Sequence, residues 1–119
     1  MYSFDLKGKA LVITNSGLFT EDEAKSFMND YQQKVKTIDA KSTSLILNAT
    51  GLKVLPQEMM PMLQQCMEIY MKDGFKNVFI VEFASAITNS QIKRIAQTIG
   101  FDQKYKMFPT EEEAIKAAN

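Results

Sequence analysis

The 119-residue chain contains no histidine and no tryptophan, and its one cysteine is Cys66. Without histidine, the chain lacks the most common general base and the most common metal ligand of proteins. A single cysteine cannot form an internal disulfide, which is typical of proteins in a reducing compartment and predicts a cytoplasmic location. We therefore expect no metal and no cofactor.

The chain also lacks an excess of either charge and lacks long apolar runs. Its 14 basic and 14 acidic side chains cancel, and no cluster of Lys and Arg offers the charge that a nucleic-acid backbone attracts. No segment reaches the roughly 18 to 20 apolar residues of a membrane span, and residues 1–5 do not have a signal-peptide pattern. We expect neither a nucleic-acid partner nor a membrane span.

Glycine and proline are scarce, at 5 and 3 residues, whereas 45% of the residues are apolar. This composition is typical of a globular protein, and a chain of this length can bury one core without disulfides or metals. The sequence therefore predicts a single domain over residues 1–119.

Hydrophobic patterns predict five strands and four helices. An alternating segment and a following apolar segment predict two paired strands, and shorter apolar runs predict three more, at Tyr2–Lys7, Lys9–Thr14, Leu45–Leu47, Val78–Val81 and Tyr105–Phe108. Capping boxes predict the starts of three helices, at Thr20–Glu23, Thr88–Gln91 and Thr110–Glu113. Another helix, before Gly74, begins either at Pro56 with a bend at Pro61 or near Pro61 itself.

The resulting β-β-α-β-α-β-α-β-α order predicts an α/β fold with a mixed or mostly parallel sheet and helices packed on it. The predicted core is Leu11, Ile13, Phe27, Leu45, Leu47, Leu63, Phe79, Val81, Ile95 and Ile99.

Three segments resemble the STAS domain, the module of sulphate transporters and anti-sigma-factor antagonists. They are Gly17–Thr20, Leu45–Leu52, and the end of the chain from Gly100-Phe101 through Phe108–Ile115. This likeness covers nearly the whole chain. It implies a STAS-like fold and a role in protein recognition.

One part of the chain departs from that family. Asn48 stands where the family usually has an Asp at the strand end, and Pro56-Gln57-Glu58 stands where antagonists carry Asp-Ser-Ser with the phosphorylated serine. No hydroxyl remains at those three positions, so we expect no phosphoswitch. Glu58 either mimics a phosphate or simply favours the first turn of a helix.

The helix before Gly74 is rich in methionine. On an ideal helical wheel its apolar arc covers about 200 degrees, twice the roughly 100 degrees that one buried face needs. Either neighbouring elements cover the surplus, or one flank is offered to a partner. The partner is a regulatory protein or a second copy, as in a homodimer, and the expected partner-binding residues are Thr50, Lys53, Gln57, Glu58, Met60, Pro61, Gln64 and Met71.

No catalytic constellation emerges from the residues. Cys66 lies on the apolar face of its helix, away from a helix start, which favours a structural thiol over a nucleophile. The acidic runs Glu21–Glu23 and Glu111–Glu113 occupy first turns, where carboxylates complement the helix dipole. We therefore predict a non-enzymatic protein.

Two alternatives remain open. A small molecule or lipid could bind at the loops after the strands, Asn15–Gly17, Asn48–Gly51 and Ala84–Ala86, since ligands of α/β sheets gather there. A degenerate enzyme scaffold is the other alternative.

Overall fold

A computed structural model describes residues 2–17, 20–52, 57–83, 85–101 and 104–119. Strands β1 (Tyr2–Lys7), β2 (Ala10–Gly17), β3 (Ser44–Leu52), β4 (Asn77–Val81) and β5 (Tyr105–Phe108) form one sheet, in the order of the chain. β1 pairs antiparallel with β2, and all other neighbours are parallel. The predicted fold class and element order are confirmed.

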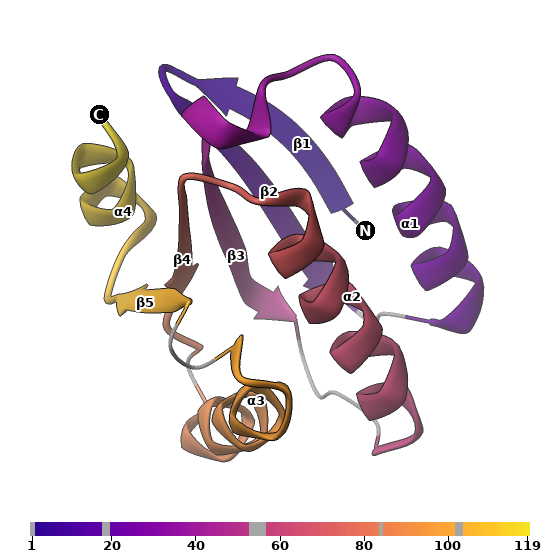
Figure 1. Ribbon diagram of the computed structural model, residues 1–119. Coiled ribbons are helices and arrows are strands. Elements are labelled where there is room, and N and C mark those ends of the chain that lie inside the picture. The colour runs from indigo at the N-terminus through magenta and orange to yellow at the C-terminus, as the bar shows by residue number, and fades with distance from the viewer. Residues whose placement is uncertain (1, 18–19, 53–56, 84, 102–103) are drawn as a thin grey trace.

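Four α-helices cover the sheet on both faces, namely α1 (Glu21–Val35), α2 (Met60–Asp73), α3 (Ala86–Ile99) and α4 (Glu111–Ala118). Helices α1, α2 and α3 lie on one face and α4 lies on the other (Figure 1). Short 3-10 turns, η1 (Ala40–Ser42) and η2 (Gln57–Met59), precede β3 and α2.

Alternation along the strands divides the buried side chains between the two faces. Leu11 and Ile13 of β2 point toward the three-helix face, whereas Ala10 and Val12 point toward α4. Of the predicted core, six side chains are buried, namely Leu11, Ile13, Phe27, Leu45, Phe79 and Val81. The others, Leu47, Leu63, Ile95 and Ile99, pack against this core but are only partly buried.

In two of the predicted capping boxes the threonine hydroxyl forms the expected bond. The hydroxyl of Thr20 accepts a hydrogen bond from the Glu23 amide at 3.2 Å, and the hydroxyl of Thr110 accepts one from the Glu113 amide at 3.2 Å. The start predicted at Thr88 is wrong. Ser85 caps α3 instead, accepting a bond from the Thr88 amide at 3.3 Å, and Thr88 is buried inside the helix.

β3 is longer than predicted, because the segment expected to be a turn at 48–51 continues the strand. Ser16 of β2 pairs with Gly51, and the pairing reaches Leu52 after a register shift. The local preference of residues 48–51 for a turn is overridden here by pairing with β2, which is far away in sequence.

Helix α2 begins near Pro61, as one of the two alternatives for this helix expected. The preceding η2 turn ends at Met59, so Pro61 lies in the first turn of α2. Amides in the first turn of a helix have no acceptor within the helix, so the missing N–H of Pro61 costs no helical hydrogen bond. Gly74 ends the helix in the left-handed conformation, with φ of 71°. Pro56 lies outside the described residues.

Candidate functional site

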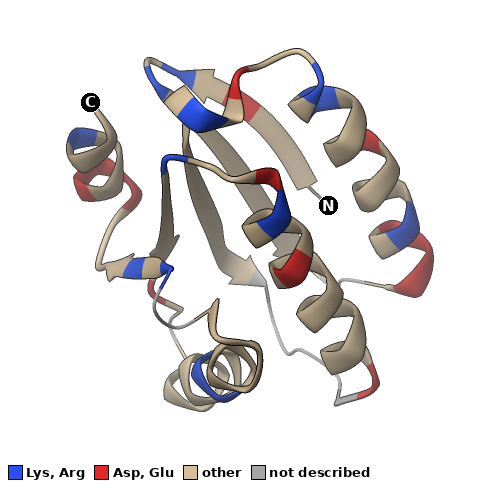
Figure 2. Cartoon of the chain, viewed as in Figure 1, with Lys and Arg blue, Asp and Glu red and all other residues tan. Residues whose placement is uncertain are grey.

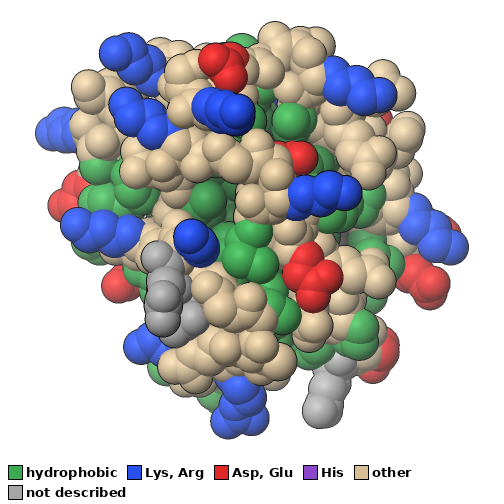
Figure 3. Space-filling model, in the orientation of Figure 1, with side chains coloured by type: hydrophobic (Ala, Val, Ile, Leu, Met, Phe, Trp, Pro, Cys, Tyr) green, Lys and Arg blue, Asp and Glu red, His purple; other side chains and the backbone are tan. Residues whose placement is uncertain are grey.

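Most of the apolar surface of α2 is covered by neighbouring elements of the fold. Cys66, Met67 and Tyr70 are buried in the core of the three-helix face. Met60 and Met71, expected to be an exposed flank, are only partly buried and pack against the same core. This flank is therefore half covered rather than open, and hydrophobic side chains reach the surface along the middle of this face, where α2 lies (Figure 3).

A groove of about 390 Å³ lies beside this flank of α2, where α3 approaches it. It is lined by Met60, Pro61, Gln64, Gln65 and Glu68 of α2 and by Ile95 of α3. We refer to these six residues as the α2–α3 groove. Three of the residues expected to bind a partner, Met60, Pro61 and Gln64, are brought together there.

The other expected partner-binding residues lie elsewhere. Thr50 is exposed near the end of β3, and Glu58 is exposed in η2. Gln57 also lies in η2, where the structure describes its backbone and not its side chain. Lys53 lies outside the described residues. Met71 lines a separate depression at the other end of α2. Those of the eight predicted residues whose side chains the structure describes thus do not form a single surface.

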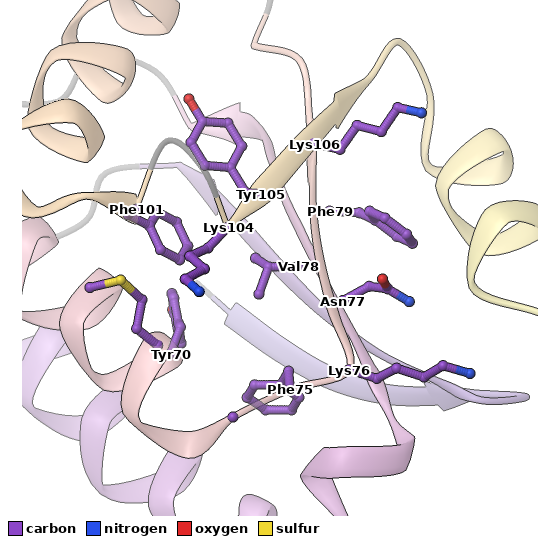
Figure 4. A pocket seen from close by; sticks show the side chains of 12 residues that line it. Tyr70, Phe75, Lys76, Asn77, Val78, Phe79, Phe101, Lys104, Tyr105 and Lys106 are labelled. Carbon is purple, nitrogen blue, oxygen red and sulfur yellow. The ribbon is translucent and has the colours of Figure 1, made fainter.

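That second depression, of about 500 Å³, opens where β4 extends beyond β5 at the edge of the sheet. Tyr70, Phe101 and Tyr105 line one side of it, and Lys76, Lys104 and Lys106 lie around its rim. Figure 4 shows Lys76 and Lys106 pointing to one side of the strands and Lys104 pointing to the other. The ammonium groups do not converge, so the depression lacks the focused charge of an anion site.

Sequence reasoning also missed an apolar side chain on α3. Ile87 is 73% exposed, in the first turn of that helix. Its neighbours Ala86, Ser90, Gln91 and Arg94 line a shallow hollow with it. A helical wheel drawn from the correct start, Ala86, would have placed Ile87 on the outer side of α3.

Asn48 connects β3 to the start of α4. Its amide nitrogen donates to Glu111 Oε1 at 3.0 Å, and its carbonyl oxygen accepts from the Thr50 amide and hydroxyl at 3.2 and 2.7 Å. Lys7 of β1 donates to Glu111 Oε2 at 3.2 Å. The Asn48 hydrogen bond, together with the Lys7 ammonium, lowers the pKa of Glu111. Asn48 therefore links β3 to the first turn of α4.

Cys66 has the properties of a structural thiol. It is 4% exposed, and burial raises its pKa to about 11. Its Sγ lies 3.4 Å from the sulfur of Met28. The nucleophilic form, the thiolate, is therefore scarce at neutral pH.

The acidic side chains do not gather into a metal site. Within the described ranges, no three Asp, Glu, Cys or His side chains lie close enough together to hold a metal ion. Acidic residues gather instead at the first turns of α1 and α4, as Figure 2 shows. No helix among the described residues has the length and apolar character needed to cross a bilayer.

Neither a protein-family model nor a curated protein matches the sequence. Solved structures do. Bacillus SpoIIAA in its phosphorylated form, a cell fate determinant, is similar over 100% of both chains, with a TM-score of 0.69 and 13% identity. The STAS domain of a SulP transporter from Vibrio cholerae aligns with 96% of this chain and 84% of its own, with a TM-score of 0.66 and 22% identity.

A protein from Shewanella loihica, described as having a SpoIIAA-like fold, aligns with 100% of this chain and 93% of its own, with a TM-score of 0.68 and 14% identity. The chain therefore has a STAS-like fold, as its sequence predicts. Identities this low establish the fold and leave its use in this protein to be argued from the residues.

Proposed function

We propose that this STAS-like domain is a non-catalytic regulatory module that binds another protein through the α2–α3 groove. The observation that carries the proposal is the groove itself, in which Met60, Pro61 and Ile95 provide apolar surface beside the amide of Gln64 and the carboxylate of Glu68. An apolar centre with a polar border is the usual composition of a protein-binding surface. Methionine suits such a surface because its side chain adapts to the partner.

The partner we propose is a helical segment of a regulatory protein. A groove between two helices accepts the apolar side of a third helix, read through side chains spaced three or four residues apart. Glu68 favours a basic residue on that segment, and Gln64, which donates to Glu68 at 3.3 Å, keeps the carboxylate oriented. An anti-sigma-factor antagonist from Mycobacterium paratuberculosis has a similar structure, with a TM-score of 0.57 and 17% identity, and supports this class of function.

The proposed binding does not depend on phosphorylation. Pro56-Gln57-Glu58 offers no hydroxyl where antagonists carry their regulatory serine. We therefore infer that the domain is permanently competent to bind. Thr50, Lys53, Gln57 and Glu58 are proposed as contacts at the border of the surface, and Met71 is proposed to support α2 from its other end.

The test compares two equal substitutions on opposite flanks of α2. Met60→Asp introduces a charge into the groove, whereas Met62→Asp introduces the same charge on the opposite flank, at a side chain that is also partly buried. Candidate partners are recovered from native extract on the immobilised wild-type domain, purified, and titrated against both variants by calorimetry. We expect Met60→Asp to weaken binding at least tenfold and Met62→Asp to change it less than threefold.

Light scattering over a wide concentration range tests the alternative partner, a second copy of the chain. A dimer that Met60→Asp dissociates would identify the groove as a self-association surface and would contradict the proposed regulatory partner. Equal loss of binding in both variants, with both folded by circular dichroism, would exclude the groove as the interface.

A further inference from the structure

Five exposed lysines gather at one end of the molecule, where the parallel strands begin and the helices before them end. The chain passes through this end in the segments 8–9, 36–43 and 72–76. The lysines of these segments are Lys9, Lys36, Lys41, Lys72 and Lys76, and each is exposed. Figure 2 shows basic residues around this upper end of the sheet. We refer to these five residues as the basic end.

Backbone hydrogen bonds hold three of the lysines along one edge of the sheet. The carbonyl of Lys9, just before β2, accepts from the Ser44 amide of β3 at 2.9 Å. The amide of Lys76, just before β4, donates to the Thr43 carbonyl at 3.0 Å. Two strand spacings therefore separate Lys9 from Lys76, roughly 10 Å at the backbone. The η1 turn that carries Lys41 leads into β3, the strand between them.

Few acidic side chains offset this charge. Within the described ranges, none of the five lysines forms an ion pair with a carboxylate. The three segments contain two acidic residues, Asp39 and Asp73, which accept hydrogen bonds from the hydroxyls of Ser42 and Tyr31, each at 2.7 Å. Five positive charges thus face two negative ones at this end, although the whole chain has no net charge.

Acidic residues gather at the opposite ends of the same helices. The run Glu21–Glu23 forms the first turn of α1, whose last residues lead to Lys36. Glu58 lies in η2, just before α2, whose last turn contains Lys72. Figure 2 shows these acidic residues at the lower end of the view. The molecule is therefore polarised along its helices, and an anionic surface would attract it with the basic end foremost.

Helix ends explain only part of this pattern. Lys36 and Lys72 lie at the carboxyl-terminal ends of α1 and α2, where a positive charge complements the helix dipole. Lys9 and Lys76 precede strands, so no such dipole accounts for them. Their charges add to the same side of the molecule, which points to an anionic partner.

The form of the basic end favours a broad anionic surface over a nucleic-acid strand. Proteins bind single-stranded nucleic acids by combining basic residues with aromatic side chains that stack on the bases. Phe75 is the one aromatic residue in the three segments, and it packs against the core. Lysines spread over five positions, on long flexible side chains, suit the fluid layer of head groups at an anionic membrane.

We propose that the basic end binds the surface of a membrane that contains anionic lipids, through their acidic head groups. The large apolar side chains that are exposed among the described residues, Leu6 and Ile87, lie outside the three segments, so the contact is electrostatic. Salt should therefore reverse it, since the Debye length shortens from about 10 Å at 0.1 M to about 3 Å at 1 M. The α2–α3 groove begins at the other end of α2, so the two surfaces are independent.

The first test compares vesicles of phosphatidylcholine alone with vesicles of phosphatidylcholine and phosphatidylserine. Cosedimentation of the whole chain with each kind of vesicle measures its partition coefficient at low and at high salt. We expect at least tenfold stronger binding to the mixed vesicles at low salt, and loss of this difference at high salt. Equal binding to both kinds, or binding to neither, would overturn the proposal.

Two triple variants of equal net charge locate the contact. The first removes three charges from the basic end, by Lys9→Gln, Lys41→Gln and Lys76→Gln. The second removes three exposed charges from α1 and α3, by Lys25→Gln, Lys93→Gln and Arg94→Gln. We expect the first to weaken binding to mixed vesicles at least tenfold and the second less than threefold. Equal losses in two variants that circular dichroism shows to be folded would assign the binding to net charge and refute the proposal.

A fluorescent single-stranded DNA oligonucleotide distinguishes a membrane from another polyanion. At the low salt concentration where mixed vesicles bind, we expect no saturable change in its anisotropy. Saturable binding that the first triple variant abolishes would assign the basic end to nucleic acid and contradict the proposal. If that variant does not fold, Lys36→Gln combined with Lys72→Gln replaces it in both assays and should also weaken vesicle binding.

Discussion

The two faces of the sheet are built from side chains of different size. The three-helix face is filled by large residues, among them Phe27, Tyr31 and Phe101, each no more than 2% exposed. The α4 face is closed by small ones, Ala10, Ala114 and Ala118, around Val12 and Ile46. Small residues let one eight-residue helix lie close to the sheet, whereas large and flexible residues leave gaps between three helices.

Polar anchoring also differs between the faces. α4 is attached at both ends, by Glu111 to Asn48 and Lys7 at its start and by Asn119 to the Lys9 amide at 2.8 Å after its end. Gly8, at φ of 63°, lies so close to the Asn119 side chain that a Cβ there would collide with it. Helices α1 and α2 are joined by a hydrogen bond from Tyr31 to Asp73 at 2.7 Å. The candidate groove lies on the face with large side chains.

The largest effect is expected on the three-helix face. Phe27 contacts the rings of Tyr2, Phe4 and Tyr31, with ring centroids 5.3 to 6.1 Å away. Phe27→Ala leaves a void in this cluster and should lower the free energy of unfolding by about 3 to 5 kcal/mol. Urea denaturation followed by circular dichroism measures the change, and a loss below about 1 kcal/mol would show that the cluster can collapse around the void.

The opposite kind of substitution, from a small to a large side chain, should destabilise the packing of α4 on the sheet. Ala114 is fully buried between α4 and the sheet, so Ala114→Leu has no free space to enter. Overpacking of this kind costs roughly 1 to 3 kcal/mol. Ala117→Leu, an exposed neighbour on the same helix, is the matched control and should stay within about 0.5 kcal/mol of wild type in the same denaturation.

Asn48→Asp should reverse the pH dependence of the stability that the contact between Asn48 and Glu111, at the start of α4, contributes. In the wild type the pKa of Glu111 is lowered, so its stabilising contribution is present above its unfolded pKa and is lost as the pH falls through the folded value. In the variant two carboxylates face each other, and the pKa of the pair rises. The variant should therefore be destabilised by about 1 to 2 kcal/mol at pH 7 and recover toward pH 4.

Thermal unfolding between pH 4 and pH 8 follows this effect, with Asn48→Ala as the control that removes the hydrogen bond without adding a charge. A variant whose deficit stays constant across this range would contradict the proposed repulsion between the two carboxylates.

The smallest expected effect concerns the helix caps, one on each face. Thr20→Ala and Thr110→Ala each remove a hydroxyl that accepts a hydrogen bond in the first turn, and each should cost about 1 kcal/mol. The loss at Thr110 should speed amide exchange in α4 more than the loss at Thr20 does in α1. The shorter helix has fewer remaining bonds, and hydrogen exchange monitored by mass spectrometry distinguishes the two.

Local patterns predicted most of the fold and little of the candidate sites. The order of the elements and the threonine caps of two of the three capping boxes are confirmed, because alternation and caps depend on residues close together in the chain. The cap predicted at Thr88 failed because Ser85, three residues earlier, offered the same chemistry. Of the partner-binding prediction, Met60, Pro61 and Gln64 share a groove, and whether they bind a partner stays a prediction.

The sequence by itself determined which segments become strands and helices, that α2 buries one face, and that the chain has the pattern of a STAS-like domain. Only the tertiary structure decided that α3 half-covers the Met60 flank and that Asn48 bonds Glu111 across 63 positions. The physical reason is that periodicity records only which side of an element is apolar. What finally covers that side depends on residues brought together by the packing of the whole sheet.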